Sequence, residues 1–437
     1  MSRTIAVAGW LITAGCLTVS TAQDTEPRSA INISHIDQKL ESLQSQIDAL
    51  RHVNPPGVNA FPAPQPHSPE WPTSSLTGLI QTDLGYFQQD AASRAAVGDI
   101  QDGADFRRVR VGVKGKVWHS TSYMIEMEYA NLNRVAFTDV FLQRDGDHMN
   151  IRLGRWRQPF GMAALTSVKE LSFIERSSTF GFVPFRQTGL GAFGTWCDEQ
   201  GTWAVSGFRT ESDAIGGSLG DDGGWGLASR TTYLLADDPS QHQLVHMGFD
   251  YSLIAPPDDS LRFSSRPEAF LAEVGVSRIP DFVDTGSIAT ESASLFALEA
   301  AFQSGPLHGQ SEYFYTTLDS PAGGSIHFQG AYSQLVYSLT GETRPYSRKQ
   351  GVFTRPAFDN SVDCGGSGAW ELAARWSWID LDDTGIAGGE LTTLTAGVNW
   401  YLNPHCKLQF NYINAAHDTG GTDAQTNLFV TRAQLDF

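Results

Sequence analysis

Short segments in which polar and apolar residues alternate recur along most of the chain. In the last of them, Phe429, Leu435 and Phe437 lie on one face, and Arg432 and Asp436 lie on the other. A period of two residues is typical of a β-strand with one face toward an apolar environment and one toward water. The pattern therefore predicts an all-β protein.

Between residues 76 and 437 we identify seventeen such segments, separated by clusters of Gly, Asp, Asn, Ser and Pro. Bacterial single-chain barrels close with an even number of antiparallel strands. We therefore predict an antiparallel transmembrane β-barrel of about 16 strands, with 18 as the alternative, and expect one segment to be spurious. The candidates are 76–88, 106–118, 123–131, 136–143, 150–157, 189–196, 202–209, 225–234, 243–251, 269–278, 294–302, 308–315, 328–339, 369–379, 391–401, 407–416 and 427–437.

The connections between the candidate strands differ in length. Some are tight, such as 118–120 and 403–405, and others are long and rich in Gly and Asp, such as 213–224 and 343–368. Short turns at one end and long loops at the other end are typical of outer-membrane barrels. The sequence contains no internal repeat at a fixed spacing, which argues against a β-propeller.

The first 75 residues have a different organisation. Residues 1–22 have a basic start, an apolar run and a small-residue end, which predicts a secretory signal peptide, with a lipoprotein signal at Cys16 as the alternative. Residues 23–53 carry apolar residues at heptad spacing and predict a short periplasmic coiled coil, or an amphipathic helix lying on another surface. Residues 54–75 contain seven prolines and predict a stiff linker before the barrel at 76–437.

Composition narrows the function class. The chain has 30 Lys and Arg against 48 Asp and Glu, and a net charge of −18 argues against nucleic acid as a partner. The mean hydropathy of −0.23 excludes a bundle of transmembrane helices, whereas a barrel can be mildly hydrophilic because half of its strand residues face the lumen. The spacing of Cys197, Cys364 and Cys406 fits no metal motif, so we expect neither a metal nor a cofactor.

Basic residues are concentrated in residues 106–188, which hold 13 Lys and Arg and 7 Asp and Glu. Arg108, Arg110 and Lys114 share one face of their candidate strand, and valines fill the other face. Because Lys or Arg facing lipid at mid-membrane costs about 2–4 kcal/mol, we expect these cations to line the lumen. Glu126 and Glu128 of the next strand are expected to pair with them. Each Arg could therefore equally well stabilise the wall through an ion pair or line the path of the solute.

Residues 158–189 are too long for a turn and alternate only weakly. An inserted loop of this kind can fold into a large barrel and narrow it, so we expect a constriction loop here. Fixed cations compensate a passing anion for its lost hydration, and guanidinium groups suit phosphate oxygens. The expected anion-contacting residues are Lys169, Arg176 and Arg186 of the loop, together with Arg155 and Arg157 at the end of the preceding strand.

Several sequence blocks resemble the phosphate-selective porin O and P family. They follow in the family's order over most of residues 76–437 and are 150–161 (NIRLGRWRQPFG), 174–177 (IERS), 186–189 (RQTG), 339–346 (LTGETRPY), 369–375 (AWELAAR) and 397–404 (GVNWYLNP). The resemblance implies a sixteen-stranded trimeric outer-membrane porin that passes small anions. Phe437 also resembles the terminal aromatic residue of outer-membrane barrels, where the barrel-assembly machinery would recognise the last strand.

We therefore expect a porin in the cell outer membrane, a water-filled channel for passive diffusion of small solutes with a preference for anions such as phosphate. Its expected partners are outer-membrane lipid, small anionic solutes and two further copies of itself. The alternative is a non-conducting adhesive or structural barrel. An enzyme is not expected, because no His lies in a recognisable catalytic block, and His242 and His246 would lie about 13 Å apart on one strand, too far to share a metal.

Overall fold

The structure is a computed structural model that describes residues 39, 41–46 and 71–437, except 131–134, 211–212, 219–223, 272–278, 322, 357–359, 419–420 and 422. The chain divides into two units, residues 1–68 and 69–437. In the first unit, Lys39 and residues 41–46 are helical and exposed. The predicted signal peptide, the rest of the heptad segment and the linker up to residue 70 lie outside the described residues.

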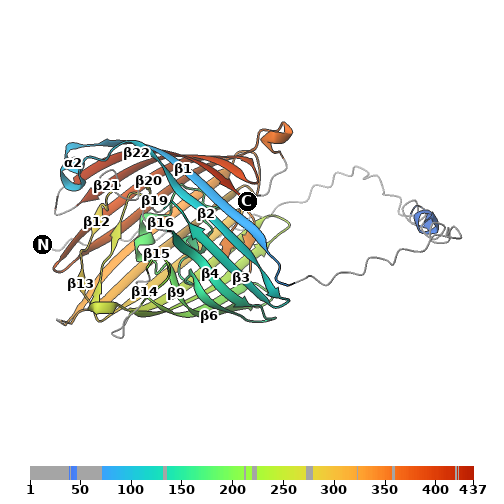
Figure 1. Cartoon of the computed structure of the whole chain (residues 1–437). Helices are drawn as coiled ribbons and strands as arrows, with labels where there is room; N and C mark the ends of the chain where they lie inside the picture. The colour runs from blue at the N-terminus through green and yellow to red at the C-terminus, as the bar shows by residue number, and fades with distance from the viewer. Residues whose placement is uncertain are drawn as a thin grey trace, which may run out of the picture. The chain divides into compact units, whose positions relative to one another are not determined.

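The second unit is a closed barrel of sixteen antiparallel strands, which confirms the predicted fold class (Figure 1). Each strand pairs with the next one along the chain, and the last strand pairs with the first. In barrel order the strands are β1 (Ser75–Gln89), β2 (Gly103–Trp118), β3 (Thr121–Glu128), β4 (Ala136–Arg144), β5 (Asn150–Arg157), β6 (Arg186–Trp196), β7 (Gly201–Arg209), β8 (Trp225–Asp238), β9 (Gln243–Ala255), β14 (Ser292–Ser304), β15 (Leu307–Asp319), β16 (Ser325–Ser338), β19 (Ala369–Asp383), β20 (Ile386–Asn403), β21 (Cys406–Asp418) and β22 (Asp423–Asp436).

Shorter elements lie in the connections. They are α2 (Ala91–Val97), α3 (Met162–Leu165), η1 (Ser178–Phe182), η2 (Pro257–Asp259), β10 (Ser260–Leu261), β11 (Ser264–Ser265), β12 (Val283–Asp284), β13 (Ile288–Ala289), β17 (Tyr346–Ser347), β18 (Val352–Phe353) and η3 (Val362–Cys364). None of the described helices is both long enough and apolar enough to cross a membrane.

The alternation in the sequence places apolar side chains outside the barrel and polar side chains inside it. In β22, Phe429 and Leu435 are exposed on the outer face, whereas Arg432 and Gln434 are buried on the inner face. This is the reverse of a soluble protein, and it fits a wall between lipid and a polar lumen.

The closing pair of strands joins β22 to β1, as the barrel prediction required, and Figure 1 shows the two strands side by side. The backbone N–H of Gly78 donates to the carbonyl oxygen of Phe437 (2.8 Å), and the N–H of Phe437 donates back to Gly78 (3.2 Å). A Cβ atom at position 78 would lie 2.2 Å from the Phe437 ring. Glycine at position 78 therefore makes room for the terminal aromatic ring on the outer wall.

Sixteen of the seventeen candidate segments overlap barrel strands, and segment 269–278 does not. Its described residues Ala269 and Leu271 are buried in an apolar cluster inside the barrel. Segment 269–278 is therefore the spurious candidate.

The expectation of short turns at one end and long loops at the other is wrong for one connection. Because neighbouring strands are antiparallel, the β2–β3 turn (119–120), the β20–β21 turn (404–405) and the β16–β19 connection (339–368) all lie at the same end. In outer-membrane barrels the short-turn end is periplasmic. The β16–β19 connection is therefore a long segment at the periplasmic end.

Described residues of the inserted loop (158–185), the β9–β14 connection (256–291) and the β16–β19 connection lie in the lumen. The first two pack in one apolar cluster against inward residues of the wall, represented by Ile174, Phe282 and Leu428. The inserted loop and the β16–β19 connection contact each other, since Arg344 Nη1 donates to Ser172 Oγ (2.7 Å). Segments therefore enter the lumen from both ends of the barrel.

Candidate functional site

A cavity of about 810 Å³ lies inside the barrel, along the inner faces of β1 to β8. The strand residues that line it cluster toward the short-turn end, as 110–116 in β2, 202–206 in β7 and 191–193 in β6 show. The inserted loop, through Lys169, and the β16–β19 connection, through Lys349, complete the lining. The cavity therefore lies between the wall and two inserted segments, the inserted loop and the β16–β19 connection.

The lining is strongly cationic, although the whole chain is acidic. Only Glu126 and Asp139 contribute negative charge, against eight basic side chains. A concave site with one sign of charge concentrates ions of the opposite sign. The basic residues of the lining are Arg110, Lys114, Lys116, Arg152, Arg157, Lys169, Arg230 and Lys349.

Four of the eight predicted residues are in this lining: Arg110, Lys114, Arg157 and Lys169. Lys114 is exposed to the lumen on the face of β2 opposite Val113. Arg157 Nη1 donates to two carbonyl oxygens of the inserted loop, at 2.7 and 3.1 Å. Arg157 therefore both lines the cavity and supports the loop.

Lys169 and Arg110 are held by their neighbours. Lys169 Nζ donates to Thr77 Oγ1 (3.1 Å), and partial burial lowers the pKa of this ammonium group. Arg110 pairs with Glu128 (2.6 Å) and lies 3.6 Å from Glu126, so the expected cross-strand pairing is present. Both cations are fixed in position at the edge of the cavity.

Arg108 has a different environment. Its guanidinium binds both carboxylate oxygens of Glu175 in the inserted loop, at 3.1 and 2.9 Å, and it is 4% exposed. Arg432 of β22 binds the same carboxylate at 2.8 Å and also Asp83 of β1. Arg108 thus belongs to a buried ion network that joins the loop to the wall.

The remaining three predicted residues also contact protein groups. Arg176 donates to the carbonyl oxygens of residues 163, 164 and 166, and its burial and three neighbouring arginines lower the pKa of its guanidinium. Arg186 pairs with Asp139 at 2.7 Å. Arg155 donates to the carbonyl oxygen of Phe137 (3.0 Å). These contacts fix the loop and the strand ends that surround the cavity.

Sequence reasoning missed four of the lining cations as site residues, namely Lys116, Arg152, Arg230 and Lys349. Lys116 shares the face of β2 that carries Arg110 and Lys114. Arg152 stands four residues before the buried Trp156, on the same face of β5, and its guanidinium lies 4.1 Å from the Phe141 ring centroid. Alternation alone would have found Arg152. Alternation would also have placed Arg230 on the inner face of β8. Lys349 gives no such signal, because its position depends on how the β16–β19 connection folds back into the barrel.

Comparison with known proteins agrees with this architecture. Residues 76–437 match the family described as phosphate-selective porin O and P. An uncharacterized protein of Caulobacter vibrioides is 30% identical over 378 residues, covering 82% of this chain and 73% of that protein. Porin O of Pseudomonas aeruginosa is 24% identical over 398 residues, covering 83% of this chain and 88% of the relative.

Solved structures show the same fold at low sequence identity. The anion-selective porin from Comamonas acidovorans gives a TM-score of 0.55 at 15% identity, over 84% of this chain and all of that one. The trimer form of OmpT from Vibrio cholerae gives a TM-score of 0.51 at 11% identity, over 84% and 99% of the two chains. At these identities the likeness supports the fold alone.

Proposed function

Because the chain belongs to the phosphate-selective porin O and P family, and is thus an outer-membrane porin, we propose that small inorganic anions such as phosphate pass through its cationic cavity. The observation that carries the proposal is the lining of eight basic and two acidic side chains, in a protein whose net charge is −18. The family and the fold are those of a channel and not of an enzyme.

The cations of β2 supply sites in series. Lys116 and Lys114 are two residues apart, about 6–7 Å along the strand, and Arg110 follows four residues further on, at about 13 Å. An anion that loses part of its hydration shell regains charge-assisted hydrogen bonds at each position. Several moderate sites in series conduct well, because the ion must leave each site as readily as it enters.

The inserted loop is proposed as the constriction. It carries Lys169 to the cavity edge and occupies lumen space that would otherwise be water. Arg108, Arg155, Arg176 and Arg186 are proposed to set the position of the loop and the surrounding wall, because each of them donates to protein groups and is outside the cavity lining. The direct contacts with the anion fall to Arg110, Lys114, Arg157 and Lys169.

A charge-reversal pair tests the proposal. Lys114→Glu combined with Lys169→Glu should lower the anion-to-cation permeability ratio, measured as a reversal potential under a salt gradient in planar bilayers. Arg144→Glu is the matched control, because Arg144 is exposed at the end of β4 and is absent from the lining. Unchanged ion preference in the double variant would overturn the proposal, and absence of stepwise currents in the wild type would favour a structural barrel.

We further propose export through residues 1–22, recognition of the Phe437 strand by the barrel-assembly machinery, and assembly into a homotrimer in contact with outer-membrane lipid. The apolar outer face of β22 and the trimer form of one structural neighbour support these steps. Cross-linking of the detergent-solubilised protein measures the oligomeric state, and a monomer would contradict the last of them.

A further inference from the structure

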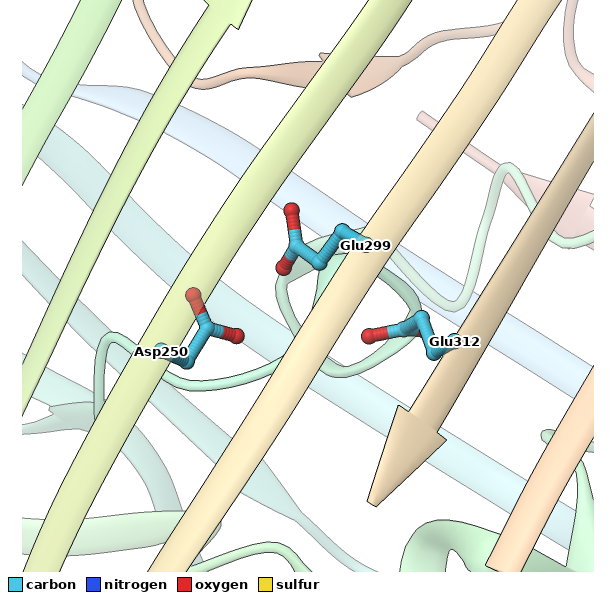
Figure 2. A group of neighbouring side chains, drawn as sticks. All are labelled: Asp250, Glu299 and Glu312. Carbon is cyan, nitrogen blue, oxygen red and sulfur yellow. The ribbon is translucent and has the colours of Figure 1, made fainter.

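Three carboxylates meet on the inner wall, away from the cavity lining. Asp250 of β9, Glu299 of β14 and Glu312 of β15 point toward one another from neighbouring strands (Figure 2). One oxygen from each lies within 4.8 Å of the others, and the three residues are 0–2% exposed. Glu299 and Glu312 stand directly opposite each other in the strand register, an arrangement that is destabilising when both are charged.

This carboxylate cluster holds the start of the inserted loop. The N–H of Gly161 donates to Asp250 Oδ2 (2.6 Å). The N–H groups of Met162 and Ala163 donate to the two oxygens of Glu312, at 2.7 and 2.9 Å. The N–H groups at the start of the loop are therefore bound to the wall by carboxylates.

The same cluster holds the β16–β19 connection. Arg230 of β8 binds both oxygens of Glu299, at 2.9 and 2.7 Å, and also donates to the carbonyl oxygens of Gln350 and Gly351. His246 lies between Glu299 (3.0 Å) and the hydroxyl of Tyr346 (2.6 Å). Both inserted segments are thus anchored at one place on the wall.

The charges around the cluster do not balance. The facing titratable groups are Arg230, His246 and Tyr332 of the wall and Tyr346 of the β16–β19 connection, while the inserted loop offers N–H groups. Three carboxylates thus face one guanidinium and one imidazole. Five of the six carboxylate oxygens accept hydrogen bonds, whereas Asp250 Oδ1 is buried without a hydrogen-bond partner among the described residues and lies 3.8 Å from Arg230 Nε.

We propose that Asp250 Oδ1 carries a proton directed at the neighbouring carboxylates, and that this proton locks both inserted segments to the wall. A proton needs only one donor and one acceptor oxygen and no added space. A divalent cation such as Ca²⁺ requires six to eight oxygen ligands, and here five of six carboxylate oxygens already accept N–H or O–H groups. Removal of the proton as the pH rises leaves three negative charges beside one guanidinium, and their repulsion loosens the first turn of the loop.

Infrared spectroscopy tests the proton without any channel measurement. The purified wild-type barrel at neutral pH should show the carbonyl-stretch band of a protonated carboxylic acid, and Asp250→Asn should lose that band. Asp83→Asn is the matched control, because Asp83 is equally buried on the inner wall but has both oxygens bound by Arg432. Absence of the band in the wild type, its survival in Asp250→Asn, or a stoichiometric divalent cation that a chelator removes would each overturn the proposal.

A second readout rests on the proposed function. Wild-type current should change between neutral and alkaline pH as the loop loosens, and Asp250→Asn should lose this pH-dependent component because its amide imitates the protonated acid. If the wild-type current stays the same over the pH range in which the infrared band disappears, the proton does not lock the loop. That result would overturn the locking role but not the proposed porin function. If Asp250→Asn fails to fold, the titration of the band and the current in the wild type remains decisive.

Discussion

Glu175 is the residue on which the contact between the inserted loop and the wall depends most. Its carboxylate accepts from Arg107 (2.9 Å), Arg108 and Arg432, and its backbone carbonyl accepts from Arg375 (3.0 Å). Burial opposes its ionisation, but the three arginines outweigh burial and hold the pKa of Glu175 well below its usual range. The residue is therefore charged under all ordinary conditions.

Glu175→Gln should lower the free energy of unfolding by about 3–5 kcal/mol, because it leaves buried arginines without their shared counter-ion. Urea titration of the barrel in detergent, followed by tryptophan fluorescence, measures the change. Asp99→Asn is the control, since Asp99 pairs with Arg94 at the surface, where both side chains are more than half exposed and such pairs contribute little. Equal stability of the two variants would contradict this account.

The same carboxylate gives the stability a defined pH dependence. Because the folded-state pKa of Glu175 is depressed, its contribution is complete above the ordinary carboxyl pKa of about 4.3 and is lost as the pH falls toward the folded value. Wild-type stability should thus decline below about pH 4 more steeply than that of Glu175→Gln. Parallel profiles of the two proteins would show that other acids dominate.

Residue type alone does not tell which cations face the solute. Arg108 and Arg110 stand on the same face of β2, yet Arg108 is held by the inserted loop while Arg110 borders the cavity. The difference arises from contacts between residues far apart in sequence, such as Arg108 with Glu175. Alternation correctly predicts the face of the strand on which each arginine lies. It does not predict which group the arginine contacts.

At the scale of elements, the β22–β1 seam depends on one glycine. The Phe437 ring covers Gly78, and a Cβ atom there would lie 2.2 Å from the ring. Sequence alternation predicted that β22 closes the barrel, because an unpaired edge is not tolerated in a membrane. The glycine contact was not predictable, since it depends on the register between the two strands.

Gly78→Ala should lower the free energy of unfolding by about 1–3 kcal/mol, because the terminal ring must move away from the wall. The double variant with Phe437→Ala should lose less than the sum of the single changes, since the clash disappears with the ring. Gly207→Ala is the control, because a Cβ atom at that outward position of β7 meets nothing within 4 Å. Additive losses in the double variant would argue against the packing.

The wall strands and the inserted loop were predicted from the sequence, whereas the entry of the β16–β19 connection into the lumen was not. Every second residue of a wall strand faces lipid and is apolar, so the period of two is visible in the sequence. The β16–β19 connection meets no such repeated boundary, and its position follows from contacts with distant strands, as between Tyr346 and His246. Four of the eight lining cations were predicted, on β2, β5 and the inserted loop. The four that were missed are Lys116, Arg152 and Arg230 on strands and Lys349 on the β16–β19 connection.

At the scale of the whole molecule, the lumen differs between its two ends. The β9–β14 connection packs an apolar cluster near the long-loop end of β9 to β22, with Ile254 and Leu428 in the wall. The cationic cavity lies toward the short-turn end of β1 to β8, with Lys114 and Lys349 in its lining. Charge and apolar surface are thus segregated along the barrel axis.

That segregation has an electrical consequence. An anion driven from the periplasmic end meets the lysines before the inserted loop, whereas one driven from the outside reaches them only after it. The protein should therefore behave as a diode under symmetric salt, with unequal currents at equal and opposite voltages. Single channels in symmetric potassium chloride measure this directly: the inequality should shrink in Lys114→Glu and persist in Arg144→Glu, and a linear wild-type current–voltage curve would contradict it.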